Sequence, residues 1–293
     1  MAAGQESVVQ LALGTAQFGV AYGVAGRGQV VPEPEVRGIF EHAATCGIRV
    51  LDTAPAYGAI EARLGSLLEG LDFEVVSKIS ALPAAVAEED ARQIVDASIA
   101  RSVDRLGSRL TTLLFHRGED LLGPHGDALW GTAQSFAGAG LRIGVSCYDP
   151  GTLVELRRRY PITVAQVPGN ALDQRLAASD RGSISEVDIH LRSVFLQGLL
   201  LLPAIAARER VPAASGAIAR WADWCASLRI GPIAAALATA RAVPGVRLCV
   251  VGVDREAQLK EILVAWDITA PPAAKHLACD DLDVIDPRRW AAH

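Results

Sequence analysis

Short apolar runs rich in β-branched residues alternate with stretches of helical spacing, and this alternation restricts the possible folds more than any other feature. The predicted strands are residues 8–13, 49–52, 73–79, 111–115, 142–146, 163–167, 190–195 and 248–253. Eight strands that alternate with helices over ~250 residues favour a (β/α)8 TIM barrel over an open sheet. We therefore expect a single barrel domain over residues 1–293.

The stretches between the strands carry apolar residues at helical intervals, and several of them end at a glycine. The predicted helices are residues 34–46, 61–69, 88–106, 127–139, a short helix from Pro150, 221–242 with a break near Gly231 and Pro232, and 255–266. A doubly wound fold usually carries GxGxxG after its first strand. The glycines near the first strand, Gly14, Gly19 and Gly23, do not have this spacing, so the barrel is the preferred prediction.

Composition excludes several classes of protein. The net charge of -5 gives no basic surface for nucleic acid. No uninterrupted apolar run reaches the ~18 residues that a membrane span needs, and the first ten residues do not resemble a secretory signal. The five cysteines are odd in number and never form a CxxC pair, which argues against a disulfide framework and a zinc site. We expect a cytoplasmic protein, with a monomer as the default state.

Four reactive side chains fall at or just beyond the ends of three consecutive predicted strands: Asp52, Tyr57, Lys78 and His116. Such positions face the active-site mouth of a barrel. Each has an ordinary structural interpretation by itself, such as a turn cap or a packed ring, but their joint occurrence favours a reactive site. Lys78 is the most informative, because only three of the 28 basic residues are lysines and the others are arginines. A lysine ammonium has a pKa that its surroundings can shift, so it is not interchangeable with an arginine guanidinium.

These four residue types suit carbonyl reduction. Hydride arriving at a carbonyl carbon leaves negative charge on the oxygen, which then needs a proton. A free tyrosine with a pKa of ~10 is a weak acid near neutrality, and a nearby lysine lowers that pKa. We expect Asp52 to hold Lys78 in place and His116 to donate a hydrogen bond to the substrate oxygen.

The chain also resembles the aldo-keto reductase superfamily, and its bacterial branch in particular. The matching pieces run in order through residues 13–19, 51–58, 61–65, 77–78, 113–116, 143–146, 165–167, 192–200 and 250–261. The resemblance implies a (β/α)8 barrel, a cofactor that is usually NADPH, and a catalytic tetrad of Asp52, Tyr57, Lys78 and His116.

The resemblance further implies a set of cofactor-binding residues. Ser146 and Gln166 would contact the nicotinamide carboxamide. The pyrophosphate would lie along Ser193, Gln197 and Gly198, and the adenosine end near Gly252, Gln258 and Glu261. The whole predicted set is Gly14, Thr15, Ala16, Asp52, Ser146, Gln166, Ser193, Gln197, Gly198, Gly252, Val253, Asp254, Arg255, Gln258 and Glu261.

Three positions depart from the family's pattern. Cys147 stands where relatives commonly have asparagine, and Gly169 stands where an aromatic ring often stacks on the nicotinamide. The glycine removes that platform and leaves room for a larger substrate or a different lid. Asp254 beside Arg255 puts the cofactor in question, since a carboxylate repels a 2′-phosphate but can accept a hydrogen bond from a free ribose hydroxyl. The family favours NADPH slightly, and NADH stays open.

Two other functions stay open. The chain could be a regulatory protein that binds the cofactor without turnover, or a sugar isomerase or epimerase on the same barrel. Of the histidines, only His116 and His190 fall at strand ends, so no metal site is predicted. The expected substrate is a small carbonyl compound, such as a sugar or hydroxy-aldehyde. Arg117, Arg175 and Arg192 would favour an anionic substrate unless they are ion-paired or solvated.

Overall fold

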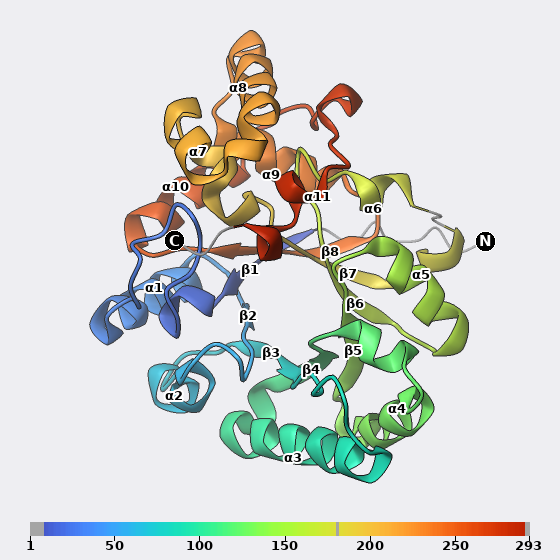
Figure 1. The fold of residues 1–293 in the computed structure, drawn as a ribbon. Helices are drawn as coiled ribbons and strands as arrows, with labels where there is room; N and C mark the ends of the chain where they lie inside the picture. Colours follow the sequence, from blue (N-terminus) through green and yellow to red (C-terminus); the bar gives the residue numbers. More distant parts are fainter. Residues whose placement is uncertain (1–8, 180–181, 291–293) are drawn as a thin grey trace, which may run out of the picture.

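Eight parallel strands close into a barrel in the computed structural model, which describes residues 9–179 and 182–290 (Figure 1). The strands are β1 (Gln10–Gly14), β2 (Val50–Asp52), β3 (Glu74–Ile79), β4 (Leu110–Phe115), β5 (Arg142–Ser146), β6 (Val164–Pro168), β7 (Asp188–Arg192) and β8 (Val246–Gly252). Each strand pairs with its successor in the sequence, and β8 pairs with β1 to complete the barrel. The predicted (β/α)8 fold is confirmed.

Helices surround the strands on the outside of the barrel (Figure 1). They are α1 (Glu33–Thr45), α2 (Ile60–Leu67), α3 (Glu88–Leu106), α4 (Gly126–Gln134), α5 (Pro150–Arg159), α6 (Arg175–Ala178), α7 (Ala204–Arg210), α8 (Ser215–Leu228), α9 (Pro232–Ala242), α10 (Glu256–Trp266) and α11 (Leu282–Ile285). None of the described helices combines the length and apolar character needed to cross a bilayer.

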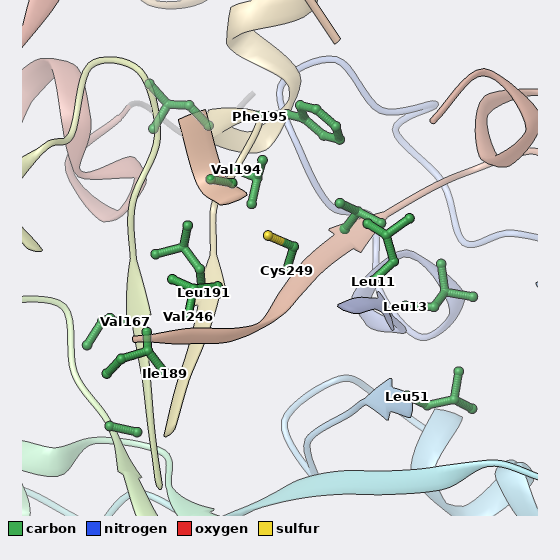
Figure 2. Packing of buried hydrophobic residues seen from close by; sticks show 14 of the residues in the cluster. Leu11, Leu13, Leu51, Val167, Ile189, Leu191, Val194, Phe195, Val246 and Cys249 are labelled. Atoms are coloured by element: carbon green, nitrogen blue, oxygen red, sulfur yellow. The ribbon is translucent and has the colours of Figure 1, made fainter. Parts of the chain in front are cut away.

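The core has two layers because successive strand residues point to opposite faces. The larger layer lies between the strands and the helices; Figure 2 shows part of it, including Leu11, Leu13, Ile189 and Leu191. The smaller layer fills the inside of the barrel. It consists of Ala12, Val50, Val76, Leu114, Val164 and Leu248. This inner apolar layer occupies the middle of the barrel, as side-chain layers do in other barrels of this kind.

A cavity of about 260 Å³ opens at the amino-terminal ends of the strands. Its lining includes Val50, Val76 and Leu248 of the inner apolar layer, together with Asp188 and His190. The inner apolar layer therefore separates the two ends of the barrel.

The predicted boundaries need several corrections. The strand predicted at residues 190–195 is β7, which ends at Arg192, because Ser193 has φ +60 and cannot continue an extended strand. The helix predicted at 127–139 ends as α4 at residue 134. The predicted break near residues 231–232 is present between α8 and α9, although α8 begins earlier than expected, at Ser215. Of the predicted first strand, residue 8 lies outside the described residues.

Candidate active site

Polar side chains from several strands point into the carboxyl end of the barrel, because side-chain direction alternates along each strand. In four strands the residue two positions beyond the inner apolar layer must face inward, since side-chain direction has a period of two. These residues are Asp52, Lys78, His116 and Gln166, which follow Val50, Val76, Leu114 and Val164. The same alternation gives Arg192 on β7, two residues after the inward-facing His190.

Asp52 is the centre of a buried hydrogen-bonded group. Its Oδ1 lies 2.5 Å from Lys78 Nζ and 2.7 Å from Gln166 Nε2. Lys78 Nζ also donates to the Thr53 carbonyl at 3.1 Å. Because β2 and β6 are on opposite sides of the barrel, the bond between Asp52 and Gln166 spans its interior. Burial lowers the pKa of Lys78, and the charge of Asp52 opposes that shift.

Tyr57 lies in the loop after β2 and faces His116. The two ring centroids are 6.2 Å apart, with the rings nearly perpendicular. Neither side chain forms a hydrogen bond with another described residue, in contrast to the paired Asp52 and Lys78. The Tyr57 hydroxyl is therefore free to donate to a bound molecule.

Two glycines allow the loop that carries Tyr57 to sit against the loop after β1. A Cβ on Gly19 would lie only 1.8 Å from the Tyr57 carbonyl oxygen. Gly58 has φ +61, and a Cβ there would lie 2.3 Å from the Gly19 carbonyl oxygen. Only glycine fits at such a close crossing of two backbones, so this pair fixes where Tyr57 stands.

The expected lowering of the Tyr57 pKa by Lys78 is not found. Burial raises the pKa of Tyr57, and the negative charge of Asp52 raises it further. Burial is the largest cause of this rise, and the Lys78 ammonium is paired with Asp52. Arg192 is a cation that lowers the pKa of Tyr57 against these effects. Burial and the charge of Lys78 lower the pKa of His116 to about 4, so this imidazole is neutral near pH 7.

A cavity of about 620 Å³ opens beside these residues and extends along the loops after β1, β7 and β8. Most of the predicted site residues line it. They are Gly14, Thr15, Ala16, Asp52, Tyr57, Gln166, Ser193, Gln197, Gly198, Gly252, Val253, Asp254, Gln258 and Glu261. Four predicted residues do not line the cavity, namely Lys78, His116, Ser146 and Arg255. Lys78 bonds to Asp52, and Arg255 is exposed.

Sequence reasoning missed two groups of lining residues. One lies in the loop after β1 (Gln17, Gly23, Ala25 and Gly26), and the other is an aliphatic slot (Leu201, Leu202, Ile233, Ile262, Ala265 and Ile268). The aliphatic residues are indistinguishable from ordinary core in the sequence. Arg192, which the sequence offers as a residue that would favour an anionic substrate, lines the cavity at the end of β7.

The loop after β7 has a strained backbone where it borders the cavity. Ser193, Leu196 and Gln197 all have positive φ, at +60, +49 and +53. Non-glycine residues in this region are uncommon and cluster at functional sites. The loop touches the loop after β1, because the Ala25 amide donates to the Gln197 carbonyl at 3.4 Å. The two loops thus meet beside the cavity.

The far end of the cavity is acidic. Asp254 is only 6% exposed, and its amide donates to Gln258 Oε1 at 2.7 Å. Glu261 lines the cavity near it. The guanidinium of Arg27 is bound to both carboxylate oxygens of Glu35, at 2.8 Å each. Arg27 near this end is therefore already paired, and Arg255 is exposed and does not line the cavity.

The residues present fit a nicotinamide dinucleotide. The volume lies in the usual ~300–1,000 Å³ range of ligand cavities. Polar groups lie at the Asp52 end, and an aliphatic slot suited to a flat heterocycle lies at the other. Gly252 permits a close approach of the Gln17 amide group, which would lie 2.3 Å from a Cβ at that position.

The departures from the family pattern have different outcomes. Cys147 is fully buried, and its Sγ would lie 2.7 Å from a Cβ on Gly118, so it packs away from the cavity. Gly169 does not leave the room expected for a substrate. A Cβ there would lie 2.6 Å from Leu191 Cδ1, so the Leu191 side chain already occupies that space.

The other candidate groups are occupied by structural contacts. Arg117 bonds to Asp120, and Arg175 bonds to Asp173. Among residues 9–179 and 182–290, no group of three or more His, Cys, Asp or Glu side chains is arranged to hold a metal ion.

Comparisons with known proteins agree with this architecture. The family model described as the aldo/keto reductase family matches residues 10–283. The glycerol dehydrogenase AKR11B4 from Gluconobacter oxydans is similar with a TM-score of 0.66 and 18% identity, covering 92% of this chain and 90% of that one. The aldo-keto reductase AKR11C1 from Bacillus halodurans, in its holo form, gives a TM-score of 0.66 and 20% identity, covering 96% and 95%. The curated proteins gave no match.

Proposed function

The chain belongs to the aldo/keto reductase family, and on that basis we propose that it reduces an aldehyde or ketone to an alcohol with a nicotinamide cofactor. The observation that carries the proposal is the arrangement at the barrel mouth. An unbonded Tyr57 hydroxyl faces His116, and the Asp52–Lys78 ion pair lies beneath them in the barrel. When bound, the cofactor would supply a hydride to the carbonyl carbon.

Tyr57 would act as the general acid. Its raised pKa keeps the phenol protonated at neutral pH, so a proton is available as negative charge develops on the substrate oxygen. His116, neutral above its pKa of about 4, would donate a hydrogen bond to the same oxygen and orient it. Asp52 would hold Lys78 in place beneath the reacting groups.

The predicted cofactor residues that line the cavity would hold the dinucleotide along its length. Gln166 would lie toward the nicotinamide end and Ser193 along the pyrophosphate, with Asp254 and Glu261 toward the adenosine end. The family favours NADPH, but the acidic far end supports NADH, because Asp254 and Glu261 line the cavity there and Arg255 does not. NADH is therefore the cofactor we propose.

Replacement of Tyr57 by phenylalanine tests the general-acid role. We expect kcat with a responsive aldehyde to fall by a factor of about 10² to 10⁴, since this is the usual contribution of a general acid. The dissociation constant for NADH, measured by nicotinamide fluorescence, should change less than twofold.

Tyr160→Phe is the matched control. Its hydroxyl donates to the Leu121 carbonyl at 3.0 Å and lies outside the cavity lining, so turnover should persist. Full activity in Tyr57→Phe would show that Tyr57 is not the acid. If the wild-type chain bound neither NADH nor NADPH, the oxidoreductase proposal itself would be wrong.

A further inference from the structure

Arg192 stands at the reacting end of the cavity with an unusual set of neighbours. It is the last residue of β7, in register with Pro168 of β6, and it lines the same cavity as Asp52 and Tyr57. Its charge reaches the reacting groups, because it lowers the pKa of His116 and opposes the rise in the pKa of Tyr57.

Arg192 differs from the nearby arginines in having no carboxylate partner. Arg117, Arg175 and Arg288 each lie between 2.5 and 2.8 Å from an aspartate oxygen. Among the described residues, no carboxylate lies within ion-pair distance of Arg192. Its two hydrogen bonds, to Ser193 Oγ and the Cys147 carbonyl, are both long at 3.4 Å. Most of the N–H donors of this guanidinium remain available to a ligand.

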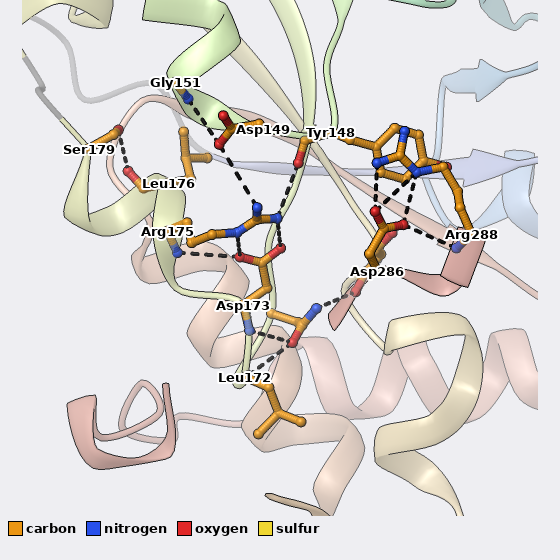
Figure 3. Close-up of polar contacts among 12 residues, drawn as sticks. Tyr148, Asp149, Gly151, Leu172, Asp173, Arg175, Leu176, Ser179, Asp286 and Arg288 are labelled. Atoms are coloured by element: carbon orange, nitrogen blue, oxygen red, sulfur yellow. Dashed lines mark hydrogen bonds and ion pairs between the residues drawn. The ribbon is translucent and has the colours of Figure 1, made fainter. Parts of the chain in front are cut away.

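The guanidinium is nevertheless held in position. Arg192 Cζ lies 3.9 Å from the centre of the Tyr148 ring, a cation–π contact. Arg288 Cζ lies 3.5 Å from the centre of the same ring and is fixed by Asp286, as Figure 3 shows. A side chain positioned in advance loses less entropy when it binds a ligand.

The residues that the Arg192 guanidinium contacts show which part of the cavity it serves. Apart from Ser193 Oγ, its contacts are with Cys147 and Tyr148 after β5, whereas the acidic far end of the cavity belongs to the segment after β8. The guanidinium therefore lies toward the reacting groups. Planar guanidinium is suited to carboxylate and phosphate oxygens, which it can bind with two hydrogen bonds.

We propose that Arg192 binds an anionic group of the substrate, so that the preferred substrates are carbonyl compounds that also carry a carboxylate or a phosphate. The inference rests on the proposed function for its reacting carbonyl, which Tyr57 would hold in the same cavity with His116 beside it.

Matched substrate pairs test this selectivity. The pairs are 4-carboxybenzaldehyde against benzaldehyde, and glyceraldehyde 3-phosphate against glyceraldehyde. We expect the wild-type chain to prefer the anionic member of at least one pair by tenfold or more in kcat/KM. The pair that shows the preference tells whether carboxylate or phosphate is recognised.

Arg192→Gln should reduce this preference by about 10- to 100-fold, mainly through KM, since a charge-assisted hydrogen bond is lost. The neutral member should lose clearly less activity than the anionic member, because it loses no hydrogen bond and feels only the altered charge near Tyr57 and His116. Arg192→Lys should keep part of the preference. Arg288→Gln is the control, because it contacts the same ring but does not line the cavity. An equal loss for both members of a pair, or a weakened NADH affinity with the preference intact, would overturn the inference.

A binding measurement separates this inference from the proposed function. Calorimetry can compare 4-carboxybenzyl alcohol with benzyl alcohol, and glycerol 3-phosphate with glycerol, without any turnover. Selective binding of the anionic alcohol that Arg192→Gln abolishes supports the anion site even if no carbonyl is reduced. Reduction of neutral aldehydes without any preference for the anion contradicts the site and leaves the reductase function intact.

Discussion

His190 shows at the scale of one residue how a barrel interior affects stability. The side chain is 3% exposed, and its Nδ1 has no hydrogen-bond partner among the described residues. Burial lowers its pKa from 6.5 to about 4. The folded state therefore resists protonation between these values, while the unfolded chain accepts the proton. The stability that neutral His190 contributes is complete above pH 6.5 and is lost as the pH falls toward 4.

We predict that His190 alone makes the free energy of unfolding about 2 kcal/mol smaller at pH 5 than at pH 7. His190→Gln should remove this part of the pH dependence, because glutamine does not titrate. Urea unfolding at pH 7, 6 and 5 measures it, with the exposed His276 replaced by glutamine as the control. An unchanged pH dependence in His190→Gln would show that this histidine is not the group responsible.

The four catalytic candidates could be predicted from sequence because each combines a reactive side chain with a strand end. Asp52, Lys78 and His116 follow apolar runs whose period fixes their direction. The contact between Asp52 and Lys78 agrees with the expectation from the sequence, whereas the rise in the Tyr57 pKa could not be predicted. That rise comes mainly from burial, together with the charge of Asp52, and burial depends on how the loops pack.

At the scale of elements, the crossing of the loops after β1 and β2 decides where Tyr57 stands. We predict that Gly19→Ala lowers kcat/KM more than tenfold, because its Cβ would lie 1.8 Å from the Tyr57 carbonyl oxygen and must push the loop aside. The melting temperature should also fall, since the clash is between backbones. Steady-state kinetics and thermal unfolding measure the two effects.

Gly131→Ala is the control for that substitution. Gly131 lies within α4, and a Cβ there would meet nothing within 4 Å, so alanine should stabilise the helix by about 0.5 to 1 kcal/mol. Wild-type activity in Gly19→Ala would show that the loop moves without disturbing Tyr57.

The helices and strands could be predicted where the hydrophobic period and the residues that end an element agree. The helix expected at residues 88–106 coincides with α3 and ends at Gly107, whose φ is +54. The end of β7 was missed because Val194 and Phe195 continue the apolar run after the strand has turned away. These two residues are buried in the outer core rather than in the sheet (Figure 2), and hydrophobicity alone cannot separate the two cases.

For the whole molecule, a bound cofactor should stabilise the fold in proportion to its affinity. A ligand at 100 times its dissociation constant contributes about 2.7 kcal/mol. We predict that NADH raises the melting temperature more than NADPH at equal concentration, because Asp254 and Glu261 line the far end of the cavity. Asp254→Asn, which removes a charge at nearly constant volume, should improve NADPH binding about tenfold.

Glu256→Gln is the control for the cofactor experiment. It removes a nearby negative charge from α10 outside the cavity lining. A larger thermal shift with NADPH than with NADH in the wild-type chain would contradict the role given to Asp254.

The inner apolar layer has a consequence for molecular traffic. It separates the reacting groups from the cavity at the amino-terminal ends of the strands, so within the described residues nothing passes through the barrel from end to end. Substrate, product and the water that returns a proton to Tyr57 must all use the carboxyl-end opening. A product that dissociates slowly from the carboxyl-end opening delays both the binding of the next substrate and the reprotonation of the Tyr57 phenol.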